Sequence, residues 1–215
     1  MYLLFPVYFA IIKITHNEFK ENAMDPQIIL LKQSELPAEK ENELCLLLSE
    51  EERTDLNKIR DTARRQLKLH AHARLREEAA RLMHMHPADL VFSKGEHGKP
   101  FLMQDEELHF SLSYTKDAAV IALAGQPIGI DIEKIRPHRM RFAKNLGTPH
   151  ELSVLRAAPD DLMLFYTFWT RKEAWLKLTG NGLTVPLTSF DVWDGPVAAR
   201  LSTFRKDDYC ISFCM

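Results

Sequence analysis

The chain has 215 residues, of which 46% are hydrophobic and 27% are charged. This balance is typical of a folded globular protein with a substantial core, and it excludes an intrinsically disordered chain. The formal net charge of −2 argues against a protein that binds nucleic acid through its overall field. The three cysteines cannot all pair with one another and lack the spacing of a metal site, so they predict a reducing, cytoplasmic location.

The first fourteen residues are almost wholly apolar, but they are too few for a membrane-spanning helix and Pro6 interrupts them. No basic residue precedes the run and no small-residue cleavage site follows it, so we expect neither a membrane contact nor a signal peptide. We expect residues 1–23 to be an extension ahead of the domain, or sequence upstream of a true start at Met24. A packed accessory strand is the alternative.

Helical patterns follow a short predicted strand at residues 28–31. One helix is predicted over residues 37–48. Ser49 and the three glutamates after it are a strong start signal for a second, which we expect to continue toward Met85. Within it, residues 53–76 carry eight Lys or Arg against two Asp. Such a charged run is normally a solvated helix face, and the alternative is a cradle for an anionic ligand.

Four histidines lie near this segment, namely His70, His72, His84 and His86. Residues two apart on a helix point in different directions, so the members of each pair do not converge on one metal ion. No cysteine stands at zinc-ligand spacing from them. We therefore do not expect these histidines to form a metal site.

Strand patterns dominate after Pro87, with turn-forming residues between the runs. The predicted strands are residues 89–93, 108–113, 118–124 and 128–133, followed near the end of the chain by 190–193, 200–204 and 209–213.

A single helix is predicted over residues 165–183, with acidic residues ahead of it and Gly180 and Gly182 ending it. Glu173 and Lys177 are four residues apart, so their side chains share one side of this helix. The spacing is typical of an ordinary surface ion pair, and the alternative is the wall of a functional site.

The run IGIDIE at residues 128–133 places two carboxylates on one face of a strand. Because strand side chains alternate, Asp131 and Glu133 project opposite the isoleucines, with Gly129 beside them leaving room. Two carboxylates this close repel each other, and a hard divalent cation such as Mg²⁺ is the usual remedy. A solvent-facing acidic edge strand is the alternative.

Taken together, these segments resemble the surfactin-synthetase-activating (Sfp) type of 4′-phosphopantetheinyl transferase, over residues 25 to about 192. The resemblance rests on five segments: LSEEER with the arginine-rich helix after it, GKP at 98–100, FSLSYT at 110–115, GIDIE at 129–133 and FWTRKEAWLKLTGNGL at 168–183. The combination of GIDIE with the pattern WxxKExxxK is specific, whereas either motif alone is a weak match.

The resemblance implies an α+β fold of two similar α/β halves, residues 24–126 and 127–215, related by a pseudo-twofold axis with the site at their interface. The first half is expected to bind coenzyme A, and the second to hold magnesium and the catalytic helix. The implied activity transfers the 4′-phosphopantetheine arm of coenzyme A to a serine of an apo acyl or peptidyl carrier protein and releases 3′,5′-ADP. The family is typically monomeric.

Roles for individual residues also follow from the resemblance. Mg²⁺ would be held by Asp131, Glu133 and Glu173. Lys177 would contact a phosphate and stabilise the leaving group. Glu173 is the conventional candidate for the proton acceptor, and a metal-bound water is an equal alternative because a carboxylate bound to Mg²⁺ is a poor base. Coenzyme A would be contacted by Arg65, Lys99, Ser113, Tyr114 and Lys177. Tyr114 stands where the family often has histidine, so it brings no positive charge to the 3′-phosphate near neutral pH.

Two other classes of function fit parts of the sequence. One is a non-catalytic module that binds coenzyme A or a nucleotide with Mg²⁺, and Tyr114 in place of histidine is the argument for it. The other is a nucleic-acid surface on residues 53–76, against which stand the lack of interleaved aromatic residues and the acidic balance elsewhere.

Overall fold

The computed structural model describes residues 9–13, 25–137 and 145–215. The elements up to residue 124 are β1 (Phe9–Lys13), β2 (Gln27–Lys32), α1 (Ala38–Leu46), α2 (Glu50–Asn57), α3 (Thr62–Met83), β3 (Phe92–Lys94), β4 (Pro100–Leu102), β5 (His109–Tyr114) and β6 (Ala118–Ala124). The later elements are β7 (Gly129–Lys134), α4 (Pro149–Ala157), α5 (Leu162–Thr179), α6 (Gly195–Ala198), β8 (Leu201–Lys206) and β9 (Tyr209–Cys214). Short 3₁₀ turns lie at Pro87–Asp89, Gly182–Thr184 and Leu187–Ser189.

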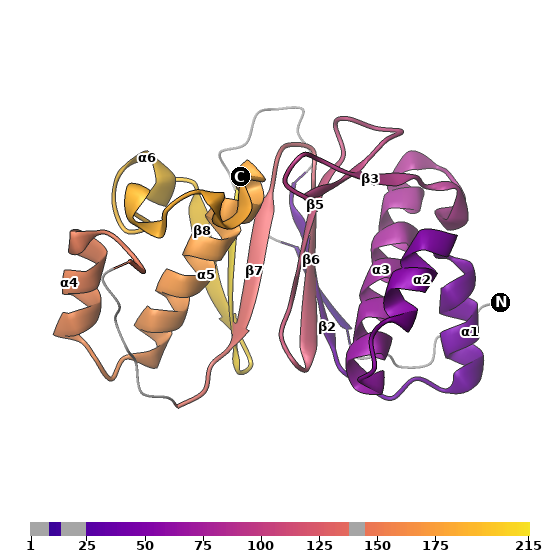
Figure 1. Cartoon of the computed structure of the whole chain (residues 1–215), viewed down its shortest axis with the longest axis horizontal. Coiled ribbons are helices and arrows are strands. Elements are labelled where there is room, and N and C mark those ends of the chain that lie inside the picture. The colour runs from indigo at the N-terminus through magenta and orange to yellow at the C-terminus, as the bar shows by residue number, and fades with distance from the viewer. Residues whose placement is uncertain (1–8, 14–24, 138–144) are drawn as a thin grey trace.

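Two antiparallel sheets form the centre of the molecule. The first has the strand order β1-β2-β6-β5 and the second the order β7-β9-β8, while β3 and β4 form a separate hairpin. Helices α1 to α3 lie outside the first sheet, and α5 followed by α4 lies outside the second (Figure 1). This mixture of helices and antiparallel sheets confirms the predicted α+β class.

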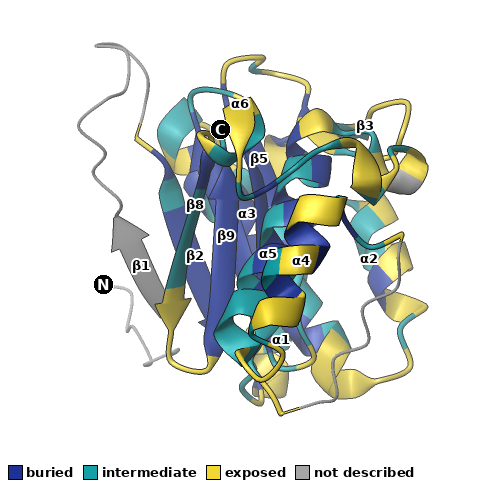
Figure 2. Ribbon diagram, turned by 90° about the vertical axis from the view of Figure 1, so that its left-hand side faces the viewer, coloured by how far each residue is buried: buried dark blue, intermediate teal, exposed yellow. Residues whose placement is uncertain are grey.

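Strand alternation divides the core into layers. In β2 and β6, Ile29 and Ile121 pack toward the helix side with Leu67 of α3. The alternate residues of the same two strands point the other way and pack toward the second sheet. There Ile28 shares a buried cluster with Ile130 of β7. Because both faces of these strands are covered, they are buried along almost their whole length (Figure 2). The core between the sheets therefore joins residues from before and after position 127, the predicted domain boundary.

The predicted helix from Ser49 toward Met85 is wrong as one element. Ser49 begins α2 with the predicted cap, since its hydroxyl accepts from the backbone of Glu52. That helix ends at Asn57, and α3 begins after Asp61, whose carboxylate accepts from the backbone of Arg64. A second N-cap inside the run therefore divides it into two helices.

The strand predicted at residues 190–193 is also absent from the structure. One carboxylate oxygen of Asp191 accepts hydrogen bonds from the backbone amides of Trp193, at 2.8 Å, and Asp194, at 3.1 Å. A side chain that binds the following backbone in this way favours a turn over strand pairing. The remaining predicted strands are present, with ends shifted by at most three residues.

The apolar N-terminal segment contributes a strand. Phe9–Lys13 pairs antiparallel with β2, so this piece has the conformation of the accessory strand that the sequence left open. The rest of the predicted extension lies outside the described residues. Within the described ranges, no helix is long and apolar enough to cross a membrane.

Four of the eight basic side chains in residues 53–76 form ion pairs with acidic side chains. Arg76, which is only 1% exposed, binds Glu52 at 2.6 Å, and Arg74 binds Glu78 at the same distance. Paired and buried guanidinium groups attract polyanions poorly. The alternative of a nucleic-acid surface on this segment therefore loses much of its charge.

Helix α5 packs closely on β7 at Gly129. A methyl group built there would lie 2.1 Å from the carbonyl oxygen of Ala174 and 2.4 Å from the amide nitrogen of Leu178, both backbone atoms. The prediction that Gly129 leaves room beside the carboxylates is therefore wrong. The missing side chain instead lets helix and strand approach at backbone contact.

We predict that Gly129→Ala destabilises the fold by about 2–3 kcal/mol, because backbone must move to accept the methyl group. For a chain of this length, that lowers the thermal midpoint by about 4–12 °C in calorimetry. Gly95→Ala is the matched control, since its methyl group meets only Lys99 O at 3.6 Å. An unchanged midpoint for Gly129→Ala contradicts the close-packing account.

Candidate functional site

The helix predicted over residues 165–183 is present as α5, and it carries Glu173 and Lys177. It begins earlier than expected, after Asp161, whose carboxylate accepts from the backbone of Leu164 at 2.9 Å. It ends at Thr179, four residues before the predicted limit, because Gly180, one of the two glycines predicted to end it, has a φ of 72° and closes the last turn. Every second residue of α5 from Tyr166 to Leu178 is buried, and the helix packs against β7 and β9. Glu173 and Lys177 line a cavity.

Asp131 of β7 is a buried carboxylate that binds side chains from β5 and α5. It is 5% exposed. Its Oδ1 accepts hydrogen bonds from Ser113 Oγ and from Lys177 Nζ, each at 2.6 Å. Its Oδ2 is buried and has no partner among the described residues. A buried carboxylate oxygen without a donor is costly, so this atom is suited to a further cation or donor.

Glu133 and Glu173 are both held in conditions that disfavour their ionised forms. Burial raises the pKa of Glu133, and the charge of Asp131 raises it further, although a hydrogen bond from Trp169 opposes the change. Burial likewise raises the pKa of Glu173, with Asp131 again adding to it and Lys177 opposing it. The three carboxylates therefore influence one another directly, as repelling charges in a poorly hydrated place.

These oxygen ligands fit a hard divalent cation, which would relieve the repulsion and use the free Oδ2 of Asp131. In the described part of the chain, however, no three His, Cys, Asp or Glu side chains converge tightly enough to hold an ion. The ammonium group of Lys177 supplies the positive charge on Asp131 instead. The set Asp131, Glu133 and Glu173 stays a prediction that requires rearrangement of side chains around the ion.

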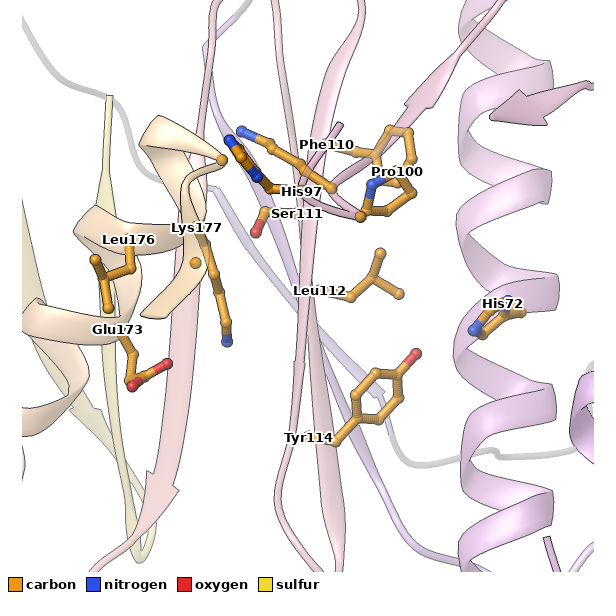
Figure 3. A pocket seen from close by; sticks show the side chains of 14 residues that line it. His72, His97, Pro100, Phe110, Ser111, Leu112, Tyr114, Glu173, Leu176 and Lys177 are labelled. Carbon is orange, nitrogen blue, oxygen red and sulfur yellow. The ribbon is translucent and has the colours of Figure 1, made fainter. Parts of the chain in front are cut away.

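A cavity of about 370 Å³ opens beside this cluster. Its walls come from α3, the β3–β4 hairpin, β5 and α5, so it lies between segments far apart in the sequence (Figure 3). Among the described strands, β5 pairs with β6 alone and forms the edge of its sheet beside the cavity. This size suits a small-molecule ligand rather than a single ion.

Lys99 lines the cavity and joins the hairpin to the end of α5. Its Nζ donates to the carbonyl oxygens of Leu178, at 3.0 Å, and Ile128, at 3.3 Å. Burial lowers its pKa. A cation at the C-terminus of a helix is favourable, and this lysine brings positive charge to the same wall as Lys177.

The other predicted contacts to coenzyme A are placed differently from one another. Ser113 points at Asp131 rather than into the cavity. Tyr114 lines the cavity, but its hydroxyl is buried without a partner among the described residues. Arg65 binds Glu41 at 3.2 Å and does not line the cavity. The structure thus brings Lys99, Tyr114 and Lys177 together, and leaves Arg65 apart.

Sequence reasoning missed other residues at or near this place. His72 and His97 line the main cavity, and Arg64 and Lys68 line a second one of about 400 Å³ next to Tyr114. The signal for His72 was present in its histidine pattern, but that pattern was tested only against metal binding. One position along α3 separates Arg64, which lines a cavity, from the predicted Arg65.

Comparison with known proteins identifies the class. Residues 127–215 match the family model of the 4′-phosphopantetheinyl transferase superfamily. The matched segment contains β7 and α5, and so the three carboxylates and Lys177. The match confirms the predicted resemblance to the Sfp type over the part of the chain that carries these residues.

Individual relatives agree. The chain is 38% identical over 132 residues to a 4′-phosphopantetheinyl transferase of Bacillus subtilis, covering 59% of each protein. It is 35% identical over 140 residues to the 4′-phosphopantetheinyl transferase Sfp of Bacillus subtilis strain 168, covering 63% of this chain and 62% of the relative. A phosphopantetheinyl transferase of Thraustochytrium is 28% identical over 199 residues, covering 77% of this chain and 69% of the relative. The chain thus spans about three fifths of the length of the first two relatives.

We predict that Glu173→Gln raises the stability of the metal-free protein at neutral pH, by on the order of 1 kcal/mol. The wild-type carboxylate has a raised folded pKa, so its ionisation weakens the fold above that pKa. The advantage of the variant should therefore be present at pH 7 and shrink as the pH falls toward the unfolded value of about 4.3. Urea denaturation across this pH range measures it.

The control for this prediction is Glu106→Gln, which changes an exposed glutamate away from the cavity. It should leave stability within about 0.5 kcal/mol of the wild type. A Glu173→Gln variant that is less stable than wild type at pH 7 contradicts the picture of strained, mutually repelling carboxylates.

Proposed function

We propose that this chain is a 4′-phosphopantetheinyl transferase that moves the 4′-phosphopantetheine arm of coenzyme A to a serine of an apo carrier protein. The observation that supports it most is the buried Asp131, with a free carboxylate oxygen, at the edge of a cavity of small-molecule size. The names of the relatives support the same activity.

In this proposal the cavity takes coenzyme A with its pyrophosphate toward α5. Asp131, Glu133 and Glu173 would hold Mg²⁺, which when bound neutralises pyrophosphate charge and so favours attack and departure. Lys177 faces the same space and would leave Asp131 for a phosphate oxygen once a metal ion takes its place. Lys99 adds a fixed positive charge on the adjacent wall.

The reaction is a displacement at phosphorus. The serine oxygen of the carrier forms a bond to the phosphorus that bears the pantetheine arm, and the bond from that phosphorus to the bridging oxygen breaks. The leaving group is 3′,5′-ADP, and Lys177 would stabilise its developing charge. The serine proton would pass to Glu173 or to a water molecule at the same place, the second alternative because a carboxylate that holds Mg²⁺ is a weaker base than a free one.

The finer features of the fold belong to the same proposal. We take the halves 24–126 and 127–215 as structurally related, because each combines a sheet with a long helix, α3 or α5, on its outer face. We place the ligand between them, because residues of both line the cavity. The proposal also includes a monomeric protein and a cytoplasmic location. For the latter, the support is three cysteines that all remain free thiols.

We predict that Glu173→Gln lowers the transfer rate by about 100-fold or more, because it removes both a metal ligand and the proposed proton acceptor. The measurement is the mass gain of an apo carrier protein incubated with coenzyme A and Mg²⁺. Chelation should abolish transfer by the wild type, and added Mg²⁺ should restore it.

The exposed control Glu106→Gln should transfer at the wild-type rate. Wild-type turnover by Glu173→Gln at saturating Mg²⁺ removes this residue from both roles. A wild-type chain that binds coenzyme A but modifies none of a panel of apo carriers contradicts the proposed activity and leaves a non-catalytic binding module.

A further inference from the structure

The two ends of the main cavity differ in chemistry. At the α5 end the lining includes Glu173 and Lys177, and at the α3 end it includes His72, Leu112 and Tyr114 (Figure 3). The lysines of the lining are engaged near α5, since Lys177 binds Asp131 and Lys99 binds the carbonyl of Leu178. Among the described residues of the lining, none is an arginine. A ligand at the α3 end therefore meets apolar walls and one imidazole.

That imidazole is held in one orientation by an acidic partner. Nδ1 of His72 lies 3.2 Å from Oε1 of Glu52. Glu52 is itself fixed, because its Oε2 accepts from Nε of Arg76 at 2.9 Å and from a terminal nitrogen of Arg76 at 2.6 Å. Arg76 in turn donates to the carbonyl oxygens of Pro87 and Leu90, so the group cannot move freely.

This contact also fixes which ring nitrogen of His72 carries hydrogen. Burial acts to raise the pKa of Glu52, but hydrogen bonds from His72 and Arg76 lower this pKa to about 2. An ionised carboxylate can only accept, so Nδ1 of His72 must donate. In the neutral imidazole, Nε2 then presents a lone pair. The His72 side chain is 34% exposed and lines the cavity, which leaves this acceptor available to a ligand.

We propose that His72 is a specificity-determining residue, and that its Nε2 accepts a hydrogen bond from the exocyclic amino group of an adenine base. The inference rests on the proposed function, because coenzyme A carries adenine at the end remote from its reactive arm. Apolar walls with few polar groups suit a flat heterocycle. A phosphate would require several cations, and those near α3, Arg64 and Lys68, line the second cavity beyond Tyr114 rather than this one.

The fixed tautomer gives this contact discriminating power. A 6-amino group donates to Nε2, whereas the 6-oxo group of hypoxanthine sets a second acceptor against it. A site that hydrogen-bonds an N–H group rejects an analogue lacking that donor, because its own acceptor is then left without a partner. Glu52 acts here as a positioning residue, since it orients His72 without touching the ligand.

The experiment compares two probes, adenosine 5′-diphosphate and inosine 5′-diphosphate, by titration calorimetry with Mg²⁺ present. The wild type should bind the adenosine compound about tenfold more tightly. His72→Leu should bring the ratio of the two affinities close to one. His72→Gln, whose amide oxygen can accept in place of Nε2, should keep part of the preference. A purely structural role for His72 predicts equal weakening of both probes and an unchanged ratio.

His84→Asn is the matched control, because it changes an exposed histidine at the end of the same helix and asparagine tolerates its left-handed backbone. It should retain the wild-type ratio. A tenfold preference that survives in folded His72→Leu overturns the inference. The inference is also overturned if a His72 variant changes only the ratio of the affinities for coenzyme A and dephospho-coenzyme A, since His72 would then contact the 3′-phosphate. Failure of the wild type to bind coenzyme A itself contradicts the proposed function instead.

Discussion

The backbone contact between α5 and β7 at Gly129 is the constraint on which the rest of the site depends. With no side chain at this position, the carbonyl of Ala174 and the amide of Leu178 lie where a methyl group would otherwise stand. Strand alternation then fixes Asp131 on the face that looks toward α5. The helix repeat in turn places Lys177 within 2.6 Å of Asp131. A glycine that packs helix on strand thus determines how carboxylates and lysine meet.

The charges gathered by this packing are poorly satisfied on their own. Asp131 has one oxygen with two donors and one with none among the described residues. Burial and Asp131 together raise the pKa values of Glu133 and Glu173. Natural proteins tolerate such strain mainly where function requires it, since apolar or neutral side chains would be more stable. The cluster is therefore better explained as part of a binding site than as a device for stability.

Much of the fold could be predicted because its signals are local. The signals were the apolar run of β6, the alternation in β7, the Ser49 cap and the glycine at the end of α5, and each acts within a few residues. The failures came where one side chain redirected the backbone. Asp61 starts a new helix inside an apparently continuous one, and Asp191 turns the chain where a strand pattern stood. Such effects depend on a single carboxylate and leave the hydrophobic period unchanged.

The site was predictable only in part, for a different reason. Asp131 of β7 and Lys177 of α5 come into contact, whereas the grouping of Asp131, Glu133 and Glu173 around one ion stays a prediction. Which way a residue of the long helix α3 faces depends on its phase, and one position separates Arg65, which binds Glu41, from Arg64, which lines a cavity. The role of Gly129 required the distance between two backbones, which no pattern contains. His72 needed its distant partner Glu52 to become informative.

Binding of Mn²⁺ in place of Mg²⁺ tests the central claim most directly, because both ions prefer carboxylate oxygen and Mn²⁺ is visible by electron paramagnetic resonance. With coenzyme A present, the account predicts one bound ion per chain, lost in Asp131→Asn and retained in the exposed control Glu106→Gln. Equal binding of Mn²⁺ by wild type and Asp131→Asn would contradict it.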